Sequence, residues 1–64
     1  MFVVHKINSN DYWTAVVGSN DGIGIDHVWG NLEDASEFHS EIDATMVARL
    51  ATRDGFSSQV EDAR

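Results

Sequence analysis

The 64-residue chain is long enough for one small domain, and its 42% content of hydrophobic residues excludes a disordered tail. It has no cysteine, which excludes disulfides and thiolate metal sites. Eleven Asp and Glu against four Lys and Arg give a formal net charge of −7, which disfavours direct contact with nucleic acid or with an anionic membrane. No apolar run approaches a membrane span, and the N-terminus lacks the layout of a signal peptide, so we expect a single cytoplasmic domain over residues 1–64.

Three β-strands are predicted in the first half of the chain. Residues 2–7 and 12–17 are rich in β-branched and aromatic side chains, and residues 23–29 alternate between two faces. Polar turn formers separate these segments, and the second turn contains Asp21-Gly22, a common hairpin signal. The pattern predicts a three-stranded antiparallel meander with one buried face.

The region after the third strand is predicted to be helical, and two readings are open. A continuous helix over residues 32–53 would place Glu33, Glu37 and Glu41 in one row. Alternatively the helix breaks near His39, leaving one helical turn at 31–35 and a main helix that begins at Glu41. The pattern favours the break.

The signals at the two ends of the main helix support that reading. Ser40 to Asp43 resembles a capping box with Asp in place of the usual Glu, and Gly55 is a natural stop. Residues 56–64 are interpreted either as a short edge strand or as a frayed tail. The expected fold is α+β, with one helix on a three-stranded meander and a short fourth strand as the variant.

The helix carries two apolar stripes, and one small sheet can bury only one of them. We expect the sheet to be covered by the first stripe, which contains Phe38, Ile42, Met46 and Leu50. The expected sheet residues are Phe2 or Val3, Ile7, Trp13, Val17, Ile23, Ile25 and Trp29. The second stripe would then be a candidate surface for self-association, formed by Ala44, Val47, Ala48 and Ala51. The alternative is that these alanines are there only as good helix formers.

The acidic residues form the main candidate for a binding surface. Between Lys6 and Arg49 lie eight carboxylates without one Lys or Arg. Such a field attracts basic protein surfaces, although acidity also serves solubility alone. The predicted acidic face consists of Asp21, Asp26, Glu33, Asp34, Glu37, Glu41 and Asp43.

Two neighbouring aromatic residues are candidates for a second contact. Tyr12 and Trp13 point to opposite faces of one strand, so at least one lies away from the core. Large aromatic side chains are enriched at binding hot spots, and they also shield the outer faces of sheets. We predict that this pair contacts a partner.

No arrangement of residues predicts catalysis, a metal site or a cofactor. His5, His27 and His39 stand on three different elements, and Asp26 and His27 point to opposite faces of their strand. His27 is expected to be a half-exposed strand residue, and the spacing around Gly22 does not fit an EF-hand. The sequence therefore predicts a binding protein rather than an enzyme.

The run Trp29-x2-Leu32-x2-Ala35-x2-Phe38-x-Ser40-x3-Ala44-x3-Ala48 resembles a pattern of small phage and bacterial strand–strand–helix proteins. In size, acidity and order of elements the chain is also similar to phage-encoded inhibitors of host machinery, namely acidic anti-CRISPR proteins and inhibitors of bacterial RNA polymerase. The resemblance implies an inhibitor that occludes the basic nucleic-acid-binding groove of a host protein or ribonucleoprotein, with a CRISPR effector as the first candidate. The alternative is an assembly module that forms a homodimer through the alanine stripe or a sheet edge.

Overall fold

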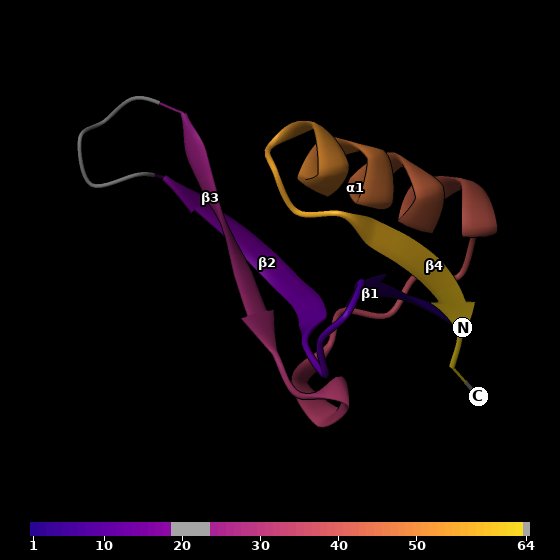
Figure 1. Cartoon of the computed structure of the whole chain (residues 1–64). Coiled ribbons are helices and arrows are strands. Elements are labelled where there is room, and N and C mark those ends of the chain that lie inside the picture. Colours follow the sequence, from indigo (N-terminus) through magenta and orange to yellow (C-terminus); the bar gives the residue numbers. More distant parts are fainter. Residues whose placement is uncertain (19–23, 64) are drawn as a thin grey trace.

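A four-stranded antiparallel sheet and one helix make up the fold (Figure 1). The structure is a computed structural model, and it describes residues 1–18 and 24–63. The strands are β1 (Phe2–Lys6), β2 (Tyr12–Gly18), β3 (Ile25–Gly30) and β4 (Ser58–Asp62). The 3₁₀ turn η1 (Leu32–Asp34) and the helix α1 (Glu41–Arg53) stand between β3 and β4. The predicted α+β meander is confirmed, and the C-terminal segment is a strand rather than a frayed tail.

The sheet has two unequal halves, in the order β3-β2-β1-β4. β1 and β4 pair along their whole length, from Phe2↔Asp62 to Lys6↔Ser58, whereas β1 and β2 share only the pair His5↔Tyr12. The start of β1 bonds instead to the segment after η1, through Phe2 N to Phe38 O (2.7 Å) and Phe38 N to Phe2 O (2.8 Å). The β2–β3 hairpin therefore diverges from α1 and β4, as Figure 1 shows.

α1 begins and ends at the residues that its sequence signals predict. The Ser40 hydroxyl accepts a hydrogen bond from the Ile42 backbone N–H (3.2 Å), so the predicted break after His39 is confirmed. At the other end Gly55 has φ +101°, and the N–H groups of Gly55 and Phe56 bond back to the carbonyls of Thr52 and Ala51. This left-handed cap satisfies the last carbonyls and turns the chain directly into β4.

The helix packs its alanine stripe against the sheet, so the prediction of the buried stripe was wrong. Ala44 and Ala51 are fully buried and Ala48 is 7% exposed, while Ile42 and Met46 are 72% and 64% exposed. The reason is volume. The sheet side already supplies large rings, so the helix can approach it only with small side chains. The residues packed around Val4, Ala44 and Ala48 are Phe2, Trp13, Trp29, Phe38, Val47 and Val60.

The far half of the β2–β3 hairpin extends beyond the core. Val17 and Ile25, which the sequence assigned to the core, are 49% and 42% exposed. Their neighbours Val16 and Val28 are 41% and 37% exposed. A register irregularity between Trp13 and Ala15 adds twist to this ribbon. Ile7 is also 42% exposed, and Ile23 lies outside the described residues.

The packing predicts that substitutions on the two faces of α1 differ in their effect on the free energy of unfolding. Ala48→Leu should lower the free energy of unfolding by about 1–3 kcal/mol, because the larger side chain must displace a close-packed core. Ile42→Ala should change it by less than about 0.5 kcal/mol, because Ile42 lies in solvent. Urea denaturation followed by tryptophan fluorescence measures both. A larger loss for Ile42→Ala than for Ala48→Leu would show that α1 faces the sheet with its other side.

Candidate functional site

His27 lies at the centre of a buried cluster that joins three elements. Its side chain is 1% exposed. The Trp13 indole N–H on β2 donates to His27 Nδ1 (2.9 Å), and His27 Nε2 lies 2.8 Å from Asp54 Oδ2 at the end of α1. Phe56 packs edge-on against the His27 ring, with centroids 5.7 Å apart. The expectation of a half-exposed strand histidine was therefore wrong.

The hydrogen bonds of His27 fix the tautomer of its ring. An indole nitrogen only donates, so His27 Nδ1 must accept, and the remaining proton sits on Nε2 and is donated to Asp54. The hydrogen bond from His27 holds the pKa of Asp54 below its usual value, and the neighbouring Arg53 acts in the same direction. Both ring nitrogens are engaged away from solvent, so His27 connects elements instead of presenting a base to a substrate.

Lys6 extends this cluster on the adjoining surface. Its ammonium nitrogen lies 5.5 Å from the centre of the Trp29 ring and 5.4 Å from that of Phe56. A cation over two ring faces gains from their negative quadrupoles. Lys6 therefore supports the join between β3 and the α1–β4 connection, and it is not available as an isolated surface charge.

His5 forms a second polar link, on the opposite side of the sheet. Its Nδ1 lies 2.6 Å from a Glu61 carboxylate oxygen and its Nε2 lies 2.6 Å from the Ser9 carbonyl oxygen, so both nitrogens face acceptors. Burial alone would lower the pKa of His5, but the bonds to Ser9 and Glu61 outweigh it and raise the pKa above 6.5. In its protonated form the ring can donate to both acceptors, and it then ties the β1–β2 turn to β4.

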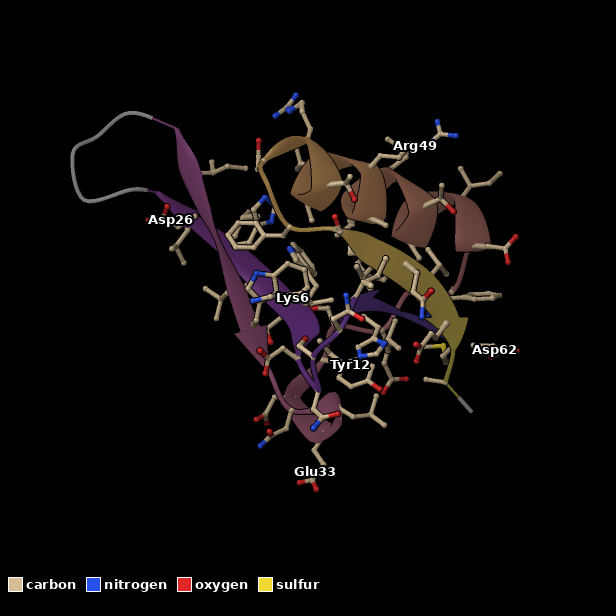
Figure 2. The ribbon with its side chains drawn as sticks, viewed as in Figure 1. Lys6, Tyr12, Asp26, Glu33, Arg49 and Asp62 are labelled. Carbon is tan, nitrogen blue, oxygen red and sulfur yellow. The ribbon has the colours of Figure 1, made fainter. Side chains whose placement is uncertain are left out.

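The predicted acidic residues lie on the surface but do not form one row. The helix is interrupted between η1 and α1, so Glu33, Glu37 and Glu41 do not share a helix face, and the alternative of a continuous helix with one carboxylate row is excluded. Figure 2 shows Glu33 at the far end of the molecule from α1, and Asp26 on the projecting hairpin. Asp21 lies outside the described residues. The exposed members of the set are Asp26, Glu33, Asp34, Glu37, Glu41 and Asp43.

The acidic residues near α1 surround apolar side chains. Glu41 and Asp43 lie in the first turn of α1, on either side of the exposed Ile42, and Met46 follows one turn later. Over the described residues, neither carboxylate takes part in a salt bridge. We call Glu41, Ile42, Asp43 and Met46 the outer α1 patch.

The two predicted aromatic contacts have partners inside the molecule. Tyr12 is half-buried and stacks on His5, with ring centroids 4.7 Å apart. Trp13 packs against the core and bonds to His27. Trp13 is therefore partly buried and engaged inside the molecule, and a contact between Trp13 and a partner is still a prediction. A contact through Tyr12 stays a prediction.

The alanine stripe is not a surface for self-association. Ala44, Ala48 and Ala51 are buried between α1 and the sheet, and Val47 packs against the same core. A second copy could reach these side chains only if α1 left the sheet. The sequence-based assignment was wrong because the helix turns its small side chains, and not its large ones, toward the strands.

Across residues 1–18 and 24–63, no three His, Cys, Asp or Glu side chains are placed to hold a metal ion. Within the same ranges, none of the helical segments has both the length and the apolar character needed to cross a membrane.

Removal of the His27 ring should weaken the whole fold. His27→Ala leaves the partly buried Trp13 N–H without a partner, which costs about 1–3 kcal/mol of unfolding free energy, and lost packing adds to this. His39→Ala is the matched control, since His39 is exposed. Urea denaturation monitored by fluorescence should show a large loss for the first variant only. Equal midpoints for the two variants would contradict a connecting role for His27.

The raised pKa of His5 predicts a loss of stability as the pH rises above 6.5. The folded state binds the proton more tightly than the unfolded state, so this contribution is complete below pH 6.5. It disappears as the pH rises through the pKa of the folded state. His5→Gln should therefore unfold with a smaller difference between pH 6 and pH 9 than the wild type. An equal pH dependence of the unfolding free energy in His5→Gln and the wild type would contradict this contribution of His5.

Comparison with protein-family models, with curated proteins and with solved structures finds no match to this chain. The resemblance to phage-encoded inhibitors thus remains a prediction from layout and charge.

Proposed function

We propose that this protein binds a basic surface on a partner protein through the outer α1 patch and the carboxylates around it. The observation that carries the proposal is the exposure of Ile42 and Met46, at 72% and 64%, between Glu41 and Asp43. Apolar side chains of this size usually enter the core of a small domain, so a pair on one helix face is a candidate anchor. An apolar centre with a charged rim is also the usual layout of a protein interface.

The charge of the chain favours a basic partner. The formal net charge of −7 draws a cationic surface at long range, and acidic side chains at the rim then set the orientation. A groove that normally holds DNA or RNA has this cationic character. Occlusion of such a groove, on a CRISPR effector or on RNA polymerase, is the function that the resemblance to phage inhibitors implies.

The broken helix changes how this occlusion would work. A continuous row of carboxylates would imitate the phosphates of a nucleic-acid strand, whereas the structure distributes them over η1, the following loop and the start of α1. The proposal therefore rests on an apolar anchor with electrostatic steering, and not on close imitation of a phosphate backbone.

A pull-down from bacterial lysate with tagged protein, with and without added duplex DNA, tests the proposal. The expected result is capture of a nucleic-acid-binding protein that DNA displaces. Retention should fall as salt rises, because the screening length drops from about 8 Å at physiological ionic strength to about 3 Å at 1 M. Captured proteins that neither DNA nor salt releases would argue against it.

Variants of the outer α1 patch distinguish the contribution of its apolar side chains to binding from that of its carboxylates. Ile42→Ser with Met46→Ser should weaken binding to the captured partner by more than about tenfold, as expected for hot-spot residues. Glu41→Lys with Asp43→Lys should slow association most strongly at low salt. Asp26→Lys, on the distant hairpin, is the control and should bind nearly as the wild type does. Loss of binding in this control alone would move the site to the hairpin.

A further inference from the structure

The outer edge of β4 presents backbone groups that no other strand uses. β4 is the last strand of the sheet and pairs with β1, and the pairing is continued just beyond the two strands by Ile7 N to Ser57 O (2.9 Å) and Ala63 N to Met1 O (2.8 Å). Backbone groups of an antiparallel strand point alternately to its two sides. In the described chain no backbone hydrogen bond reaches the outward-facing N–H and C=O groups, which belong to Ser58, Val60 and Asp62.

This edge forms one wall of an open groove beneath α1. The groove has a volume of about 540 Å³. Arg49 and Arg53 line its α1 side, and Arg53 Nε also lies 3.4 Å from an Asp54 carboxylate oxygen. Figure 2 shows Arg49 extending from α1 into solvent. The other lining residues are Thr45, Ala48, Thr52, Ser58, Gln59 and Val60.

We propose that a second copy of this chain occupies this edge, so that two β4 strands pair antiparallel about a two-fold axis at Val60. Ser58 of each chain then lies opposite Asp62 of the other. The outward N–H and C=O groups of Ser58, Val60 and Asp62 find partners, and the two sheets become one. Exposed strand edges of this kind are established docking points for extended segments.

Charge complementarity selects this pairing. Ser58 and Val60 turn their side chains toward α1, since the Ser58 hydroxyl donates to the Ala48 carbonyl (3.0 Å) and Val60 packs against the core. Asp62 has the same orientation by alternation. In the two-fold arrangement, Asp62 of each copy therefore enters the groove of the other copy, beside its two arginines.

The symmetry also aligns the two helices favourably. A two-fold axis perpendicular to the sheet places both α1 helices on the same face and in opposite directions. The acidic first turn of one helix, with Glu41 and Asp43, then approaches the end of the other that carries Arg53. The surface area buried in this dimer would be small, below about 1,200 Å². The like net charges of the two copies also oppose association. We expect dissociation in the micromolar range.

Sedimentation velocity over the micromolar range tests the dimer, with the monomer mass of 7.1 kDa as reference. Asp62→Arg should weaken association by more than about tenfold, because it places a cation beside two arginines. Arg49→Asp and Arg53→Asp added to Asp62→Arg should restore the dimer. Asp26→Arg changes the net charge by the same amount, but Asp26 lies on β3, at the other edge of the sheet. This control should leave association unchanged.

Cysteine pairing gives a second readout that fixes the register. In the proposed pairing Gln59 faces Glu61 of the second copy, with Cα atoms about 4.5 Å apart, whereas like residues lie too far apart for a disulfide. The wild-type chain has no cysteine. A mixture of Gln59→Cys and Glu61→Cys chains should form a disulfide-linked dimer under mild oxidation, and either variant alone should form far less.

Three results would overturn the proposal. The first is a monomer throughout the micromolar range. The second is a dimer that Ile42→Ser disrupts and Asp62→Arg does not, which would place the contact on the outer α1 patch. The third is a monomer whose groove binds a synthetic acidic peptide, which would make an acidic segment of another protein the occupant.

Discussion

The bond between His27 and Asp54 is the constraint on which the arrangement of the two halves depends. The β2–β3 hairpin shares one residue pair with β1, so the backbone alone attaches it weakly to the rest of the sheet. His27 spans the gap, accepting from Trp13 on its own hairpin and donating to the residue that ends α1. The position of the ribbon relative to the helix is thus set by a side chain, with Lys6 and Phe56 packed beside it.

The second constraint is the division of volume between sheet and helix. Two tryptophans and two phenylalanines occupy the space over the strands, and alanines on α1 complete the packing. A helix that contacts the sheet through small residues lies close to it, and its larger apolar side chains are left on the outside. The exposed Ile42 and Met46 are therefore a consequence of how the core is filled as well as candidates for contact with a partner.

The local signals in the sequence predicted the elements well. The strand segments, the helix break and the stop at Gly55 depend on residues within a few positions of one another, and the structure has each of them. The choice of helix face depended on the volumes of distant side chains, and the hydrophobicity of Ile42 and Met46 pointed the wrong way. The partner of His27 was also out of reach, because Asp26 was the nearest acid in sequence, whereas Asp54 comes close only once α1 has docked. A capping position at the end of a predicted helix, facing a strand histidine, is the signal that could have indicated it.

The pairing of β1 with β4 brings the two ends of the described chain together. Ala63 donates its backbone N–H to the Met1 carbonyl (2.8 Å), and Figure 1 shows both ends at one corner of the molecule. The path of the chain is therefore nearly a closed ring. A short peptide joining these ends would create a continuous loop that could be opened elsewhere, for example in the turn between β1 and β2. Any domain fused at either end would project from the same corner, beside Asp62 and away from the hairpin.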